Sequence, residues 1–335
     1  MFKPKFRITS HLIKLFEDIA SAVALINGAR LQEAFRVPLE KDAFARSVHS
    51  STWIEGNLLS LAQVRAMSEG QDVLVEQKQK FEVSNCLAAM RWILKNKNKS
   101  VTENDLLAVH TRMIKGLLPA ARSGRYRSVQ NYVVDARNKV IFTPPAPAKV
   151  ARRMKDLFMW LKDNDQHLIV RSAVFHHEFL TIHPFVDGNG RVARAIAQWL
   201  LWEKGLDPLV TLGLDDFFAQ NRARYYDVIQ QTRDMDGDYT HWVEYIAEGL
   251  MSSVEIVQGR IKEGSLRLTR VTLTPKQDEL VALLGKYGVL GAAQICKEMK
   301  INRSRVNQLI VPLVHSGIVM RTGAARAVRY RLSIK

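Results

Sequence analysis

Residues 183–194 read His-Pro-Phe-Val-Asp-Gly-Asn-Gly-Arg-Val-Ala-Arg, and no other segment of this chain says as much about its chemistry. The apolar run Ala195–Leu201 follows directly and predicts a helix, so backbone N–H groups and the positive end of the helix dipole face the segment. Gly188 and Gly190 allow the backbone to curl into an anion-binding nest. We therefore expect a polyphosphate-binding loop ahead of a helix, with a histidine base and a metal-binding carboxylate in the same loop.

The segment resembles the signature of the Fic family, HPFx(D/E)GNGRxxR, and matches it at every specified position. The resemblance implies a mainly α protein, with a Fic-type helical core and a β-hairpin flap. It also implies transfer of AMP from ATP to a Ser, Thr or Tyr hydroxyl of a target protein or of the chain itself. ATP is then the substrate, Mg²⁺ the cofactor and pyrophosphate the leaving group.

The resemblance implies a role for each residue of the loop. His183 is the expected general base, because imidazole with a pKa of about 6.5 keeps a neutral fraction at cellular pH. Asp187 is the expected Mg²⁺ ligand, since hard oxygen ligands suit this cation. Phe185 is expected to plug the loop into the core. Asn189 would orient the transferred phosphoryl group, and the two arginines would bind phosphate oxygens. The complete expected phosphate-binding set is Gly188, Asn189, Gly190, Arg191, Val192, Ala193 and Arg194.

A second motif, Ser-Thr-Trp-Ile-Glu-Gly-Asn at residues 51–57, resembles the inhibitory motif (S/T)xxxE(G/N) of autoinhibited Fic proteins. Ser51 and Glu55 are four residues apart and share a helix face, and Gly56 is expected to end the helix. In relatives this glutamate pairs with the second arginine of the loop, here Arg194, and takes the space of the γ-phosphate. The resemblance implies inhibition in cis. Removal of AMP by a water that Glu55 activates is an alternative chemistry.

Two further segments resemble parts of the family fold. In residues 132–145, β-branched and aromatic residues flank an Asp/Asn-containing turn, which predicts a β-hairpin. This hairpin resembles the flap that adds a target segment as a strand. Tyr226 resembles the family's tyrosine near adenine. Some relatives carry Asn-Glu-Gly-Asp just after it, whereas residues 233–238 read Arg-Asp-Met-Asp-Gly-Asp. This departure bears on the adenine contacts and so on the choice of nucleotide. Some Fic relatives use UMP, phosphocholine or phosphate, which remain alternatives to AMP.

Composition and length predict an ordinary globular protein of two domains. The chain has 335 residues, 47% of them hydrophobic and 24% charged. It has no apolar run of about twenty residues for a membrane span, and its N-terminus lacks the apolar core of a signal peptide. The two cysteines, Cys86 and Cys296, imply no disulfide framework. We expect a cytoplasmic protein without a membrane partner.

Helical spacing of apolar residues dominates to about residue 262, and a polar, glycine-flanked segment at residues 259–265 is predicted to link two domains. The expected N-terminal helical region covers residues 1–100 and contains the inhibitory helix at about residues 44–56. It is expected to pack as one unit with a Fic core at residues 101–262.

Residues 271–335 resemble a winged helix-turn-helix domain. The pattern predicts three helices, at residues 275–287, 292–299 and 303–314, and two strands, at 317–321 and 327–332, around a turn at Gly323. Pro312 is expected to kink or shorten the third helix, because proline removes a backbone hydrogen bond.

The charge of residues 271–335 suggests a partner for this domain. Eleven Lys and Arg against three Asp and Glu give a net charge of +8, half of the chain's +16. Arg303 and Arg305 open the third helix, and Arg321, Arg326 and Arg329 edge the two strands, where a groove and its phosphates would lie. DNA binding and protein contacts are both open, and a DNA-binding regulator with a nucleotide-sensing Fic domain is the alternative function. A homodimer is also open, since many relatives are dimers.

Overall fold

The computed structural model of the chain describes residues 2–29, 33–134, 137–162, 165–203, 205–207, 212–235, 237–268, 273–323 and 328–333. The chain divides into two compact units. The first comprises Met1–Val23, Ala45–Pro208 and Leu212–Val254, and the second comprises Ala24–Phe44, Leu209–Thr211 and Glu255–Lys335. This division groups residues 24–44 with the C-terminal residues, whereas the sequence-based boundaries placed them in the N-terminal region.

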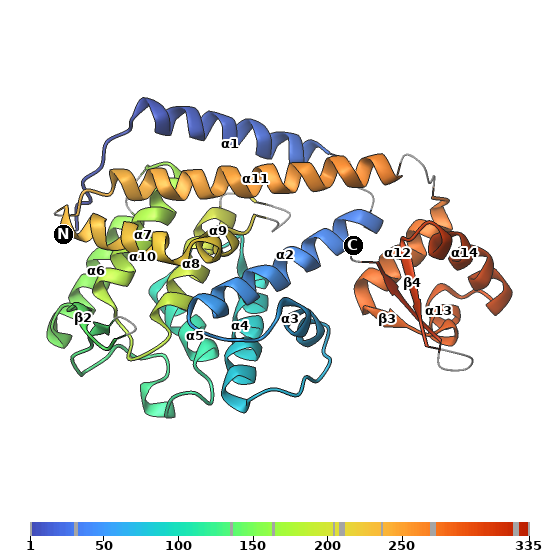
Figure 1. Ribbon diagram of the computed structural model, residues 1–335, viewed down its shortest axis with the longest axis horizontal. Coiled ribbons are helices and arrows are strands. Elements are labelled where there is room, and N and C mark those ends of the chain that lie inside the picture. The colour runs from blue at the N-terminus through green and yellow to red at the C-terminus, as the bar shows by residue number, and fades with distance from the viewer. Residues whose placement is uncertain are drawn as a thin grey trace. The chain divides into compact units, whose positions relative to one another are not determined.

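Helices dominate the described part of the chain, as predicted (Figure 1). Three long helices have residues in both units: α1 (Ser10–Gly28), α2 (Glu33–Ile54) and α11 (Thr240–Leu268). The other helices of the first unit are α3 (Leu61–Ser68), α4 (Gln77–Asn96), α5 (Glu103–Met113), the 3₁₀ turn η1 (Ala120–Arg122), α6 (Pro147–Lys162), α7 (Leu168–Ile182), α8 (Asn189–Glu203), α9 (Leu214–Gln220) and α10 (Arg222–Asp234).

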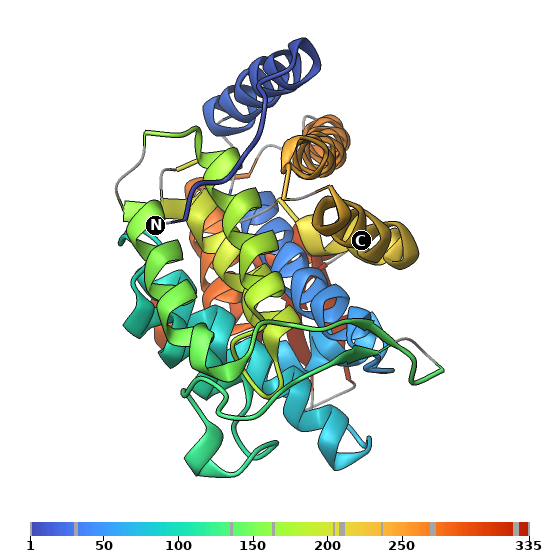
Figure 2. The ribbon, with the colours of Figure 1, turned by 90° about the vertical axis from the view of Figure 1, so that its left-hand side faces the viewer.

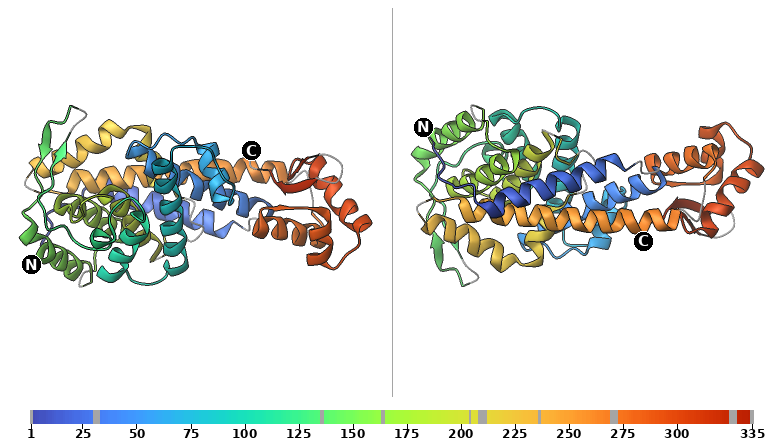
Figure 3. Two further views of the ribbon diagram at one scale, coloured as in Figure 1. Left: turned by 90° about the horizontal axis from the view of Figure 1, so that it is seen from below. Right: turned by 90° about the horizontal axis from the view of Figure 1, so that it is seen from above.

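Helices α7 and α8 pack against each other within the first unit (Figure 2). Both carry buried residues on every face, which is typical of helices enclosed by others. Helices α4, α5 and α6 contact this pair, and Figure 3 gives further views of the ribbon. The loop between α7 and α8 is therefore held by two helices that are themselves fixed by packing.

Helix α2 is longer than the predicted inhibitory helix. It begins at Glu33 rather than near residue 44, with Pro38 inside it, and it ends at Ile54. The Arg36–Glu40 ion pair at 2.8 Å, four residues apart, supports this added N-terminal part. At the other end Gly56 has a φ of +94°, and its N–H donates to the Trp53 carbonyl at 2.9 Å. This left-handed glycine terminates the helix as predicted.

The predicted flap is a short antiparallel hairpin of β1 (Val133–Val134) and β2 (Val140–Phe142). Val133 pairs with Phe142 and Val134 with Val140, with a register shift between them. Asp135 and Ala136 of the predicted turn lie outside the described residues. The hairpin prediction is confirmed for the two strands.

The predicted link at residues 259–265 is wrong as a local structure, because helix α11 continues through it to Leu268. Glycine inside a helix costs about 1 kcal/mol relative to alanine. Here the residues between the two glycines are Arg, Ile, Lys and Glu, most of them strong helix formers, which offset that cost. The prediction from composition gave too much weight to the helix-breaking tendency of Gly259 and Gly264.

The second unit contains the three predicted C-terminal helices and the predicted strand pair. These are α12 (Pro275–Tyr287), α13 (Ala292–Met299), α14 (Arg303–His315), β4 (Val319–Thr322) and β5 (Arg329–Leu332). A two-residue strand that the sequence did not reveal, β3 (Val289–Leu290), pairs with β5 and completes an antiparallel sheet in the order β3-β5-β4. Residues 324–327, which belong to the turn between β4 and β5 and include Arg326, lie outside the described residues, as does Lys335.

Pro312 does not end α14 early, so the predicted shortening of this helix is wrong. The helix continues to His315, and the Ser316 N–H donates to the Pro312 carbonyl at 2.9 Å. An interior proline costs about 3 kcal/mol, but Leu309 and Leu313 on the same helix are buried in the core of the unit. That packing holds the last turn in place.

No helix in the described part of the chain is both long and apolar enough to cross a membrane.

Candidate active site

The loop of residues 183–188 joins α7 to α8 and opens at a strained residue. His183 ends α7 with a φ of +50°, and its N–H donates to the Phe179 carbonyl at 2.9 Å. A left-handed backbone costs a non-glycine residue about 1–2 kcal/mol, and such strain gathers at functional sites. The His183 carbonyl accepts from Nε of Arg127 at 2.9 Å, which holds the residue in this conformation.

The His183 imidazole is neutral at pH 7. Burial lowers the pKa of His183 to about 4; a hydrogen bond with the Leu180 backbone opposes this shift, and the charges of Arg233 and Arg127 add to it. The neutral ring is the form that can accept a proton from a hydroxyl. A bound polyphosphate would raise this pKa, because nearby negative charge favours the protonated form.

Arg127 is a positioning residue to which sequence reasoning gave no role. Its guanidinium donates to four backbone carbonyls, those of His183, Val129, Pro145 and Ile182, and its own N–H donates to the Pro184 carbonyl at 2.8 Å. Arg127 is buried. It therefore ties the start of the loop to the segments on both sides of the flap.

His110 is a second positioning residue that the sequence did not reveal. Its ring stacks on Phe185 with centroids 3.7 Å apart, and its Nε2 lies 3.1 Å from the Asp187 carbonyl. Because Nδ1 accepts the Gly124 N–H at 2.9 Å, we assign the proton to Nε2, which then donates to Asp187. Phe185 is fully buried, which confirms its predicted role as a plug.

The two glycines of the predicted nest differ in conformation, since Gly190 lies in the first turn of α8 and only Gly188 has a positive φ. Gly188 has a φ of +80°, a conformation that side chains disfavour. A Cβ on Gly190 would collide with Oε1 of Glu55, so this position admits only hydrogen while the glutamate lies there. The first N–H groups of α8 have no partner inside the helix and face this space.

Three members of the expected phosphate-binding set have other roles in the structure. The Asn189 amide donates to the Phe185 carbonyl and accepts the Phe185 N–H, each at 2.9 Å, so both of its ends shape the loop. The Val192 N–H donates to the Gly188 carbonyl at 3.0 Å, and the side chains of Val192 and Ala193 are buried in the core. Their contacts with phosphate stay a prediction of the family resemblance.

Arg191 carries donors suited to an anion. Its guanidinium is buried, with Nη2 3.6 Å from Oδ1 of Asp187. Nε and Nη1 of Arg191 are also buried, and neither has a hydrogen-bond partner among the described residues. Unsatisfied buried donors are costly, and phosphate oxygens at this place would satisfy them.

Asp187 fits a magnesium site of the open kind. Its side chain is 57% exposed, and Oδ1 accepts the Gly188 N–H at 2.5 Å. The described residues contain no group of three or more His, Cys, Asp or Glu that could hold a metal ion by themselves. Mg²⁺ commonly binds through one or two carboxylates together with substrate phosphates and waters. A single exposed carboxylate beside a phosphate nest is compatible with that arrangement.

The predicted pairing of Glu55 with Arg194 is present. Nη2 of Arg194 donates to Oε1 of Glu55 at 2.7 Å and to the Ser51 carbonyl at 2.8 Å, and Nε donates to the Ser51 hydroxyl at 3.0 Å. Burial raises the pKa of Glu55, whereas the charge and hydrogen bond of Arg194 lower it, with smaller contributions from the charges of Arg191 and Arg222. Together these effects leave the pKa of Glu55 below its usual value. The carboxylate is therefore ionised beside Gly190.

Arg194 also contacts Asp215, a residue that sequence reasoning missed. Oδ1 of Asp215 lies 3.3 Å from Nε of Arg194, and Oδ2 of Asp215 accepts from the Ser47 hydroxyl at 2.8 Å. Burial raises the pKa of Asp215 to about 6, although Arg194 and Ser47 act against it. Nothing in the local sequence around Asp215 indicates this contact, because it joins residues from α2, α8 and α9.

The two tyrosines of α10 are placed differently. Tyr225 is fully buried, and its hydroxyl lies 2.9 Å from Nε2 of His176. Tyr226 is 39% exposed, with the guanidinium of Arg222 5.5 Å from its ring centroid. Of the two, only Tyr226 is exposed, and its contact with adenine stays a prediction.

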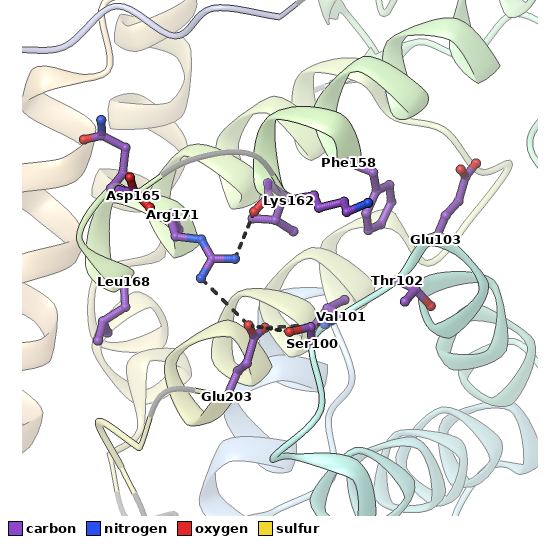
Figure 4. Close-up of a pocket in the computed structure, with 12 residues that line it drawn as sticks. Ser100, Val101, Thr102, Glu103, Phe158, Lys162, Asp165, Leu168, Arg171 and Glu203 are labelled. Carbon is purple, nitrogen blue, oxygen red and sulfur yellow. Dashed lines mark hydrogen bonds and ion pairs between the residues drawn. The ribbon is translucent and has the colours of Figure 1, made fainter.

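A pocket of about 840 Å³ lies at the other ends of the same two helices (Figure 4). Arg171 in the first turn of α7 and Glu203 at the end of α8 line it, with their charged atoms 3.8 Å apart. Lys162 and Phe158 of α6 also face it. No residue of the 183–194 loop lines this pocket, so it is not part of the site described above.

Comparisons with known proteins show a likeness to Fic proteins. Residues 100–201 match the model of the Fic/DOC family. The protein adenylyltransferase Fic of Culex quinquefasciatus is 32% identical over 251 residues, which are 72% of this chain and 47% of that protein. Its counterpart in Aedes aegypti is 33% identical over 218 residues, 62% of this chain and 40% of that protein. The chain thus spans less than half the length of these curated relatives.

Solved structures extend the likeness to the whole chain. A Fic family protein from Desulfovibrio desulfuricans G20 is similar with a TM-score of 0.69 and 26% identity, covering 100% of this chain and 99% of that one. A fragment of Fic-1 from Caenorhabditis elegans is similar with a TM-score of 0.63 and 26% identity, over 75% of this chain and 73% of that one.

Proposed function

The chain carries a Fic domain at residues 100–201, and from this premise we propose that it transfers AMP from ATP to a hydroxyl of a target protein. One observation carries the proposal: a neutral His183 stands at one end of a loop whose other end combines a nest with the unpartnered donors of Arg191. That is the set of groups needed to hold a polyphosphate and deprotonate a nucleophile.

Each group has a defined part in the proposed reaction. The phosphates lie against the start of α8, where Arg191 donates to their oxygens. Asp187 would hold Mg²⁺, which supplies positive charge to the α- and β-phosphates when bound. The target hydroxyl oxygen attacks the α-phosphorus, the bond from that phosphorus to the bridging oxygen breaks, and pyrophosphate leaves. His183 takes the hydroxyl proton.

The flap is the proposed docking edge for the target segment. Val134, Val140 and Ile141 are each nearly half exposed, although all three are apolar. A two-stranded hairpin leaves unpaired backbone groups along its edge, and an extended peptide can pair with them as an added strand. This mode would present a Ser, Thr or Tyr hydroxyl by backbone contacts, and so with little sequence demand.

We further propose that the Glu55–Arg194 contact inhibits this reaction in cis. The ionised carboxylate lies in the space beside Gly190 that a phosphate group would use. It also uses the Nη2 donor of Arg194. ATP bound with its terminal phosphate displaced would have its α-phosphorus misaligned, and loss of positioning alone can lower a rate by orders of magnitude.

A second candidate activity is removal of AMP from a modified protein. It is favoured by the same carboxylate, which is ionised and 34% exposed, and so could activate a water. Transfer and removal are separated by one set of measurements on wild type, Glu55→Gly and His183→Ala. Label from ATP marked on the α-phosphate reports transfer, and loss of label from a previously modified target reports removal.

The two proposals predict opposite effects of the glycine substitution. Inhibited transfer predicts more label in Glu55→Gly than in wild type and none in His183→Ala. Removal by Glu55 predicts that Glu55→Gly no longer releases AMP. Absence of label in every variant, with ATP still bound, would reject the transfer proposal.

A further inference from the structure

The inhibitory carboxylate occupies a weak place in its helix, because α2 ends just before Glu55. The Gly56 N–H donates to the Trp53 carbonyl at 2.9 Å, and the Asn57 N–H donates to the Thr52 carbonyl at 3.1 Å. This pair of bonds closes the helix in a Schellman ending. Helix ends fray, and the helix dipole disfavours a carboxylate at a C-terminus. The position of Glu55 therefore depends on contacts outside α2.

Asn57 makes such a contact with α4. It is only 2% exposed, although it is polar. Its Nδ2 donates to the Gln79 carbonyl at 3.0 Å and to Oε2 of Glu82 at 2.8 Å, and its Oδ1 accepts the Leu59 N–H at 3.1 Å. Both hydrogens of the amide are thus engaged on α4. We call Asn57 with its two partners Gln79 and Glu82 the α4 anchor.

Further contacts fix the same segment. The Leu58 N–H donates to Oε1 of Gln79 at 3.1 Å. Ile54 and Leu59, on either side of the anchor, are buried in the apolar core. Helix α4 itself contacts α5 and α8, and α8 carries Arg194. The α4 anchor and Arg194, which hold this segment from two directions, therefore lie on helices that contact each other.

We propose that Asn57 is a positioning residue of the inhibitory contact, and that loss of the α4 anchor releases the nucleotide site. Only two residues of chain, about 7 Å when extended, separate Asn57 from Glu55. Without the anchor the end of α2 frays, and Oε1 of Glu55 leaves the space beside Gly190 in a larger fraction of the molecules. A phosphate group can then occupy that space. This inference rests on the proposed AMP transfer and its inhibition in cis.

A purely structural role for Asn57 is the alternative, and α4 offers a matched control for it. Asn85 lies on the same helix and is 8% exposed. Its Nδ2 donates to the Lys115 carbonyl at 2.7 Å and to the Met113 carbonyl at 3.3 Å. Like Asn57, it is a buried amide that ties α4 to another segment. None of its described hydrogen bonds involves residues 55–57.

The test measures the initial rate at which the full chain labels itself from α-labelled ATP, in the wild type and in Glu55→Gly. Asn57→Ala and Asn85→Ala are each added to both backgrounds. Asn57→Ala should raise transfer about 5- to 10-fold while Glu55 is present, the equivalent of about 1–1.4 kcal/mol. It should leave the rate unchanged in Glu55→Gly, because no inhibitory carboxylate remains to be released. Asn85→Ala should raise transfer in neither background.

The partner of the Asn57 amide gives a second comparison. Glu82→Ala removes the acceptor and should raise transfer as Asn57→Ala does, again only while Glu55 is present. Glu82→Gln keeps an acceptor oxygen at the same place, so its rate should stay nearer that of the wild type. A loss of stability alone would not separate the two substitutions in this way.

Several results would overturn the proposal: no rise in Asn57→Ala, an equal rise in both backgrounds, or an equal rise in Asn85→Ala. Absence of transfer in Glu55→Gly would reject the proposed function instead, and hydrogen exchange of residues 52–59 then tests the anchor independently. These amides should exchange faster in Asn57→Ala than in Asn85→Ala. Equal exchange in the two variants would show that Asn57 does not hold the end of α2.

Discussion

Replacing Glu55 with glutamine should raise AMP transfer modestly, whereas replacing it with glycine should raise it strongly. In the wild type, Oε1 of Glu55 lies 2.7 Å from Nη2 of Arg194 and directly against Gly190. Glutamine keeps the shape of the side chain and a hydrogen-bond acceptor, and it removes only the charge. Glycine removes shape, hydrogen bond and charge together.

The structure sets the size of the two effects. A hydrogen bond that involves a charged group contributes about 1.5–3 kcal/mol, and one between neutral groups about 1 kcal/mol. The Arg194 side chain is 1% exposed but that of Glu55 is 34% exposed, so solvent weakens the part due to the Glu55 charge. Because about 1.4 kcal/mol corresponds to a factor of ten, the rate should rise about 2- to 5-fold with glutamine and about 10- to 150-fold with glycine.

The assay is the initial rate at which the full chain incorporates label from α-labelled ATP into itself at saturating Mg²⁺. Glu244→Gln serves as the control, because this α11 carboxylate accepts the Thr9 hydroxyl at 2.6 Å and is not part of the inhibitory contact. Its rate should equal that of the wild type. Equal rates for the two Glu55 variants, or rates at or below wild type for both, would refute the reasoning.

Further predictions concern the base, the loop and the metal. In the glycine variant at position 55, kcat/KM for ATP, which reports the pKa of the free enzyme, should change little from pH 8 to pH 6 and fall as the pH approaches about 4, where His183 becomes protonated; a midpoint of kcat/KM near pH 6.5 would contradict this. The melting temperature, followed by circular dichroism, should fall as the pH is lowered from 6.5 to 4. In the folded chain the pKa values of His110 and His183 are about 4, whereas in the unfolded chain they are about 6.5. In this pH range the unfolded chain therefore binds protons that the folded chain does not, which lowers stability. Arg127→Lys should lower transfer by about 100-fold through displacement of His183, with ATP affinity by calorimetry unchanged. Asp187→Ala should raise the Mg²⁺ concentration needed for half-maximal transfer, and an unchanged Mg²⁺ requirement would remove Asp187 from the metal site.

Local sequence was sufficient for the features that depend on local geometry. The glycines of the loop require particular backbone angles, and the structure has Gly188 and Gly56 in left-handed conformations as expected. The strands of the flap and the helices of the second unit also follow from turn residues and apolar spacing. The pairing of Glu55 with Arg194 was reached through family resemblance, since the two residues are 139 positions apart.

The residues that the sequence did not reveal act through contacts between distant segments. Arg127 precedes the flap and would ordinarily be taken for a solvent-exposed charge, but it is buried because several backbone carbonyls converge on it. His110 and Asp215 likewise gain their roles from partners on other elements. Asn189 shows the converse case, since its place in the motif suggested a ligand contact and the fold uses its amide to shape the loop.

The most direct measurement of the central claim compares two labels in the glycine variant at position 55. The variant is incubated with Mg²⁺ and with ATP labelled either on the α-phosphate or on the γ-phosphate, and protein-bound label is counted beside intact mass. We predict label from the α-position only, a mass increase of one adenylyl group, and loss of both when His183→Ala is added. Label from the γ-position would show phosphate transfer, and label that persists without His183 would contradict its assignment as the base.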